Sequence, residues 1–108
     1  MANVVNQIGI AQSGWTSAQA LRLALAVEQA GDPATAFRIY EALIQMKPAD
    51  EDYQAAIFRG SLILENAYFN FDRAAQGYRF LEKEYPMGSF TDQARSRLAA
   101  LQRTGRTS

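Results

Sequence analysis

One segment of the chain recurs once further along it, and this repetition constrains the fold more than any other feature. The two copies share an alanine, a tyrosine, a leucine and a proline at the same spacing. They are Ala36, Tyr40, Leu43 and Pro48 in the first copy and Ala74, Tyr78, Leu81 and Pro86 in the second, 38 residues later. The first three positions of each copy share one face of a helix. A repeat of this length predicts stacked units that bury their apolar faces against each other. We therefore expect the alanines, tyrosines and leucines to lie in the core.

Signals at the helix ends predict five helices in succession. Thr16 and Gln19 have the spacing of a capping box, and Gly31 suits the turn that ends the first helix. Asp32 is placed to cap the second helix, with Pro33 in its first turn. The expected helices span roughly residues 16–30, 33–46, 52–67, 72–84 and, with Ser89 as the cap, 89–103.

With these helices the chain resembles the tetratricopeptide repeat (TPR) family over roughly residues 17–103, as about two repeats and a C-terminal capping helix. A weaker likeness, on the segments EYPMGSFTDQARSRLAAL and AAIFRGSLIL, is to TPR accessory proteins of the bacterial cell envelope. The resemblance implies an all-α fold: a right-handed α–α superhelix of TPR-like antiparallel helix pairs.

The expected domain organisation has three parts. Residues 1–15 form an N-terminal arm, either packed or disordered, residues 16–103 form the TPR-like helical domain, and residues 104–108 form a flexible tail. The N-terminus lacks the basic region and continuous apolar stretch of a signal peptide. The cytoplasm is therefore the default location, and the periplasm is the alternative if the native chain begins further upstream. No membrane insertion is expected.

Composition argues against most catalytic chemistry. The chain has no histidine and no cysteine, which removes the commonest general base and thiolate ligands. Asp50, Glu51 and Asp52 lack the glycine turn of a calcium loop and are interpreted as an acidic helix start. We expect no enzyme activity, no cofactor and no metal.

The charge balance and the aromatic residues also argue against nucleic-acid binding. Eleven basic residues balance eleven acidic ones, whereas proteins that stack bases on aromatic rings also carry a strongly basic surface. We interpret Tyr68, Phe69 and Phe71 as core packing of a tight turn, with base stacking as the less favoured alternative.

The resemblance also implies a partner-binding groove, which the first helix of each repeat lines on the concave face. By this resemblance, the residues expected to line the groove are Arg22, Leu25, Gln29, Phe58, Arg59, Leu62, Asn66 and Arg97. Guanidinium groups beside apolar side chains suit a peptide that has both hydrophobic anchors and carboxylates. Two alternatives stay open. Residues 4–14 could cover this surface while the arginines pair with Glu28 or Glu65, or two copies of the chain could associate through it.

These patterns favour a non-catalytic protein–protein interaction module, an adaptor or scaffold that binds a protein, peptide or partner helix in the groove. The alternative is a self-associating structural subunit, a homo-oligomer, or an accessory domain of a larger bacterial envelope or secretion assembly.

Overall fold

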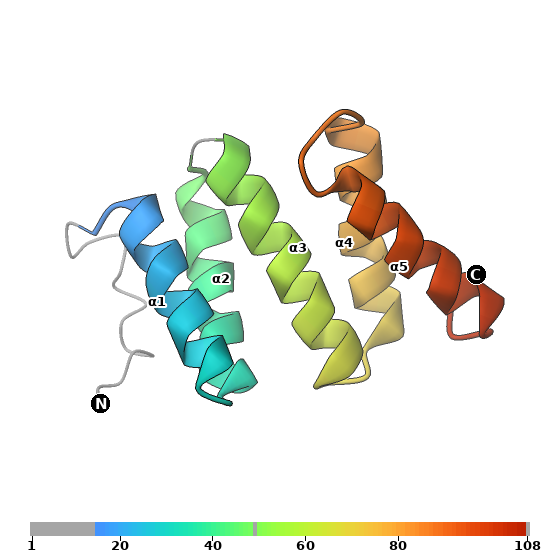
Figure 1. Ribbon diagram of the computed structural model, residues 1–108, viewed down its shortest axis with the longest axis horizontal. Helices are drawn as coiled ribbons and strands as arrows, with labels where there is room; N and C mark the ends of the chain where they lie inside the picture. Colours follow the sequence, from blue (N-terminus) through green and yellow to red (C-terminus); the bar gives the residue numbers. More distant parts are fainter. Residues whose placement is uncertain (1–14, 49, 108) are drawn as a thin grey trace. The chain divides into compact units, whose positions relative to one another are not determined.

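The computed structural model describes residues 15–48 and 50–107, which form five helices and no strand (Figure 1). The helices are α1 (Ser17–Gln29), α2 (Pro33–Met46), α3 (Asp50–Asn66), α4 (Phe71–Glu84) and α5 (Thr91–Arg103). The predicted all-α class is confirmed. The predictions for residues 1–14 of the N-terminal arm, including the proposal that residues 4–14 cover the groove, concern residues outside the described ranges.

Local signals set the boundaries of α1 and the start of α2 as predicted. The Thr16 hydroxyl accepts a hydrogen bond from the Gln19 N–H at 3.1 Å, and the Gln19 side-chain oxygen accepts from the Thr16 N–H at 2.9 Å. Gly31 follows α1 with φ +91°, in the left-handed region that glycine adopts without strain. The Asp32 carboxylate then accepts from the Thr35 N–H at 3.1 Å and caps α2. This hydrogen bonding from Thr35 lowers the pKa of Asp32.

The later helix starts follow the predictions less closely. The Asn70 side chain accepts from the Arg73 N–H at 3.3 Å, so α4 begins one residue earlier than expected. The predicted cap at Ser89 is wrong, because α5 begins at Thr91 and has no side-chain cap. The Thr91 hydroxyl instead donates to the Tyr85 carbonyl oxygen, which ties the start of α5 to the end of α4.

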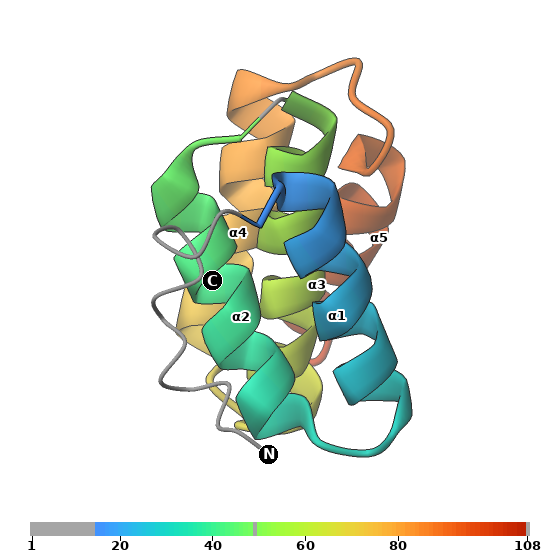
Figure 2. The ribbon, with the colours of Figure 1, turned by 90° about the vertical axis from the view of Figure 1, so that its left-hand side faces the viewer.

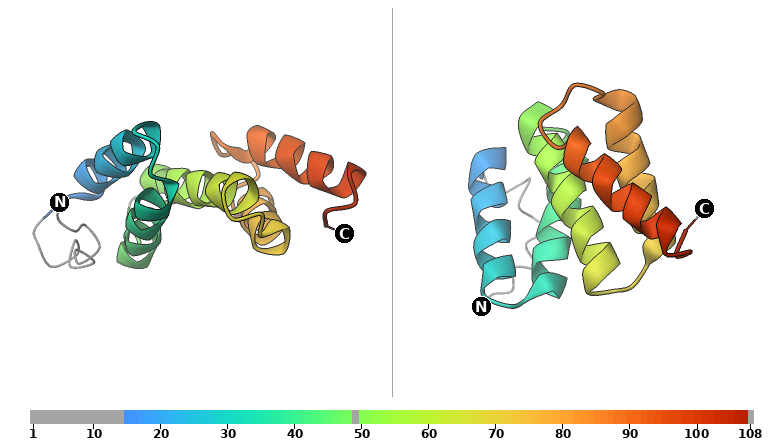
Figure 3. Two further views of the ribbon diagram at one scale, coloured as in Figure 1. Left: turned by 90° about the horizontal axis from the view of Figure 1, so that it is seen from below. Right: turned by 45° about the vertical axis from the view of Figure 1, so that its right-hand side comes forward.

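Tertiary contacts divide the chain into two compact units, Met1–Ala56 and Ile57–Ser108, with the boundary inside α3. In the first unit α1 and α2 pack side by side and run antiparallel (Figure 2). In the second unit α4 packs against α5 and against residues 57–66 of α3 (Figure 3). Each unit therefore contains one antiparallel helix pair, and the second also contains α5.

The repeated residues form the core of both units, which confirms the prediction made from the repeat. All six side chains are 0 % exposed: Ala36, Tyr40 and Leu43 on α2, and Ala74, Tyr78 and Leu81 on α4. Their spacing along α2 and α4 places the alanine, the tyrosine and the leucine of each helix on one buried face.

Each buried tyrosine also makes a hydrogen bond that the sequence interpretation missed. The Tyr40 hydroxyl donates to the Glu28 carboxylate at 2.8 Å, and the Tyr78 hydroxyl donates to the Glu65 carboxylate at 2.7 Å. In both cases the glutamate lies near the end of the first helix of the pair. The sequence repeat therefore has a counterpart in the polar contacts inside each unit.

The second unit has a close approach between helices at Gly77. A Cβ atom at this position would overlap the Ser61 hydroxyl oxygen and lie 3.2 Å from the Ser61 Cβ. The absence of a side chain at Gly77 thus lets α4 approach α3 at this point.

Candidate partner-binding surfaces

On α1, the three predicted groove residues share one face of the helix. Arg22, Leu25 and Gln29 are spaced by three and four positions, so their side chains project to the same side. Arg22 and Gln29 are exposed, and Leu25 is half-buried. In the first unit this face therefore offers a cation, an amide and part of an apolar side chain.

On α3, three of the predicted residues remain at least partly accessible. Asn66 is exposed, and Arg59 and Leu62 are half-buried. They follow the same spacing along α3 as the predicted residues do along α1. The second unit therefore offers a comparable mixed face.

Phe58, predicted as an exposed anchor, is instead a core residue of the second unit. Its side chain is 4 % exposed. The Phe58 ring stacks on Phe90 with centroids 5.5 Å apart, and it lies 6.1 Å from the ring of Tyr78. Its position on α3 turns the ring toward α4 and the loop before α5, so Phe58 does not contact a partner in this arrangement.

Arg97, predicted as a groove cation, is paired with the Glu65 carboxylate. The Arg97 Nε donates to Glu65 Oε1 at 3.2 Å, a terminal guanidinium nitrogen donates to Oε2, and Tyr78 donates to Oε1. The Glu65 side chain is only 2 % exposed, whereas that of Arg97 is 41 % exposed. This is the pairing that the sequence analysis had held as an alternative. We call these three residues the Glu65 network.

Burial and the hydrogen bonds within the Glu65 network shift the pKa values of all three side chains. Burial alone would raise the pKa of Glu65, but the hydrogen bonds from Arg97 and Tyr78 outweigh it and lower that pKa below its usual value. The hydrogen bond to Glu65 raises the pKa of Arg97. Burial, followed by the bond to Glu65, raises the pKa of Tyr78. The network joins α3, α4 and α5 through one buried ionised carboxylate.

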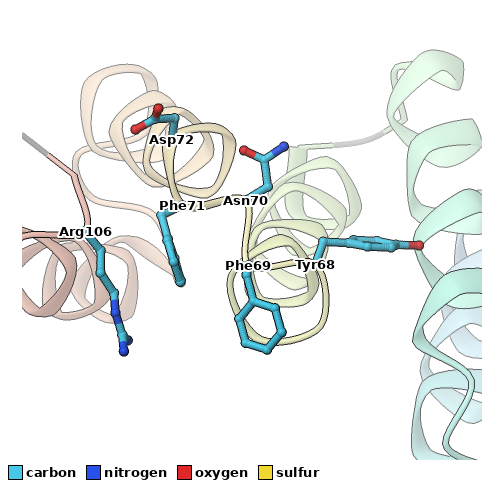
Figure 4. Close-up of a pocket in the computed structure, with 6 residues that line it drawn as sticks. All are labelled: Tyr68, Phe69, Asn70, Phe71, Asp72 and Arg106. Atoms are coloured by element: carbon cyan, nitrogen blue, oxygen red, sulfur yellow. The ribbon is translucent and has the colours of Figure 1, made fainter.

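A second accessible surface lies at the turn between α3 and α4. An open pocket there is lined by Tyr68, Phe69, Asn70, Phe71, Asp72 and Arg106 (Figure 4). Tyr68 is 46 % exposed and Phe69 is 68 % exposed, so the interpretation of these two rings as core packing is wrong. We call residues 68–71 the aromatic turn.

The C-terminal residues help to shape this pocket. The backbone N–H of Arg106 donates to the Leu101 carbonyl at 2.9 Å, and the Thr107 hydroxyl donates to the Asp72 carboxylate at 3.3 Å. The guanidinium carbon of Arg106 lies 5.1 Å from the centroid of the Phe71 ring, within the range of a cation–π contact. Through these contacts residues 104–107 fold back toward the start of α4.

Within residues 15–48 and 50–107 no group of three or more acidic side chains is placed to hold a metal ion. No helix in these ranges has the length and apolar character needed to cross a membrane. Comparisons of the chain with family models, with curated proteins and with solved structures find no match.

Proposed function

We propose that the chain is a non-catalytic protein-interaction module, built as a TPR-like right-handed superhelix of two helix pairs and a capping helix. The observation that supports this proposal is the repetition of internal contacts. The pairs in the two units each bury the same alanine, tyrosine and leucine, and each tyrosine donates to a glutamate of the preceding helix. Repeat units of this kind serve as scaffolds for extended binding surfaces.

The proposed binding surface is the accessible face of the first helix of each pair. In the first unit this face carries Arg22, Leu25 and Gln29 on α1, and in the second unit it carries Arg59, Leu62 and Asn66 on α3. Phe58 is not included in this surface because its side chain is buried, and Arg97 is not included because it is paired with Glu65. Apolar and cationic side chains together suit a partner peptide or helix that carries apolar anchors and carboxylates.

Photocrosslinking from matched positions tests this proposal. A photoreactive residue would replace Gln29 or Asn66 on the first helices, or, as controls, Gln45 or Gln76 on the exposed faces of α2 and α4. We expect the same partner protein to be crosslinked from positions 29 and 66 and from neither control. Equal crosslinking from all four positions, or crosslinking from the controls alone, would contradict the proposed surface. A crosslinked homodimer from positions 29 and 66 would assign it to self-association.

A further inference from the structure

Phe69 combines an unfavourable backbone conformation with an exposed side chain. Its φ is +54°, in the left-handed region where bulky residues are rare and glycine or asparagine is preferred after a helix. Its ring is 68 % exposed, so burial does little to compensate for the conformation. A glycine here would make a more stable turn, which points to a role for the ring outside the chain's own core.

The neighbouring side chains give this ring a chemically defined setting. The Phe69 ring meets Phe71 edge to face, with centroids 6.3 Å apart, and Arg106 lies over Phe71. In Figure 4 the rings of Phe69 and Phe71 and the guanidinium of Arg106 extend to the same side of the aromatic turn. The Asp72 carboxylate extends to the opposite side. Arg106 therefore shares its face of the turn with apolar rings and not with the pocket's carboxylate.

We infer that the aromatic turn and Arg106 form a second docking site, which binds a partner segment with an apolar side chain next to a carboxylate. The exposed rings would receive the apolar side chain. A guanidinium stacked on a ring keeps its N–H edge available for bidentate binding of a carboxylate. Charge complementarity favours an acidic partner, because Arg103 and Arg106 lie at the end of α5 and just beyond it, and residues 98–108 contain no acidic side chain. This site shares no residue with the surface proposed above, so the two proposals are tested independently.

NMR chemical-shift mapping on the full chain tests which kind of partner binds this site. The probes are three short peptides with a central phenylalanine flanked by aspartates, by serines or by lysines, together with an oligothymidylate. We expect the aspartate peptide to shift the backbone amide signals of residues 68–72 and 103–107, the serine peptide to do so more weakly, and the other two probes to leave them unchanged. Failure of the aspartate peptide to shift these signals, or equal shifts with the lysine peptide, would overturn the inference. Binding of the oligothymidylate at these residues would also overturn it, in favour of base stacking.

Glycine substitutions separate the role of the ring from the backbone strain. Phe69→Gly should stabilise the free chain and yet weaken binding of the aspartate peptide about fivefold or more. Lys47→Gly is the matched control, because Lys47, the residue that ends α2, also has a left-handed backbone, with φ +50°. It should stabilise the chain and leave binding unchanged. Arg106→Gln should remove the preference for the aspartate peptide over the serine peptide. Unchanged binding by Phe69→Gly, or an unchanged preference in Arg106→Gln, would refute the site.

Discussion

Removing the Arg97 guanidinium would leave the Glu65 carboxylate buried with a single charge-neutral donor, the Tyr78 hydroxyl. Breaking a buried ion pair by removing one partner costs about 3 to 5 kcal/mol, because an uncompensated charge stays in the interior. Since the Arg97 side chain is 41 % exposed, we expect Arg97→Met to cost about 3 kcal/mol, the lower end of this range. Urea denaturation followed by far-UV circular dichroism at neutral pH measures this loss.

Glu65→Gln is the matched variant, because it removes the charge and keeps the shape of the side chain. The glutamine oxygen can still accept from Tyr78, and the partly exposed Arg97 can regain contact with water, so we expect a loss of only about 1 kcal/mol. The reasoning therefore predicts an asymmetry in which the loss of the arginine costs more than the loss of the carboxylate. Equal losses in the two variants, or a loss below about 1 kcal/mol for Arg97→Met, would refute it.

The same network predicts a dependence of stability on acid. The pKa of Glu65 in the folded chain lies below its ordinary value of 4.5, so its contribution is present above that pH and is lost as the pH falls through the folded pKa. We expect the free energy of unfolding of Glu65→Gln to fall less than that of the parent chain below pH 4.5. Glu84→Gln, at an exposed position on α4, is the control and should follow the parent. Identical acid profiles for Glu65→Gln and the parent would contradict this assignment.

Three further predictions concern the packing of the core, and urea denaturation measures each. Leu81→Ala should lower the free energy of unfolding by about 2 to 5 kcal/mol, because it leaves a cavity in the core. Met87→Ala, at a 94 % exposed position, is the control and should change it little. Similar losses of stability in the two variants would contradict the packing. Gly77→Ala should destabilise the chain because the added Cβ would overlap Ser61, although alanine normally favours a helix over glycine by about 1 kcal/mol. Adding Ser61→Ala to this variant should recover part of the lost stability. A stabilising effect of Gly77→Ala would disprove the close approach. Gln54→Met should leave the free energy of unfolding unchanged or raise it by about 1 kcal/mol, because the buried Gln54 Oε1 has no hydrogen-bond partner among the described residues. A large loss of stability would show that this oxygen does have a partner.

Sequence alone predicted the helices and the repeated core well, because the signals for both are local. The capping box at Thr16 and the glycine at Gly31 act within one helical turn, and the spacing of Ala36, Tyr40 and Leu43 defines a helical face by itself. The start of α5 was missed because it is fixed by the hydrogen bond from the Thr91 hydroxyl to the Tyr85 carbonyl oxygen. No local capping pattern predicts this bond.

The candidate site was harder to predict, because side-chain orientation depends on residues far away in the chain. Whether Phe58 faces a partner or the core depends on Phe90, which is 32 positions later. Arg97 pairs with a glutamate that is equally distant in sequence. The exposure of Phe69 was also missed, since an aromatic run at a tight turn usually packs inward. A glutamate that precedes each repeated tyrosine by 12 or 13 positions was the available signal for the buried polar contacts.

The burial of Tyr78 has a consequence at the alkaline end of the pH scale. A tyrosine whose pKa is raised on folding contributes stability that is fully present below the ordinary pKa of 10.0 and is lost as the pH rises through the folded value. Hydroxide should therefore act as a denaturant of the second unit, since a phenolate at Tyr78 would face the Glu65 carboxylate in the interior. Ionisation of the Tyr78 phenol then becomes an optical signal of unfolding of this unit.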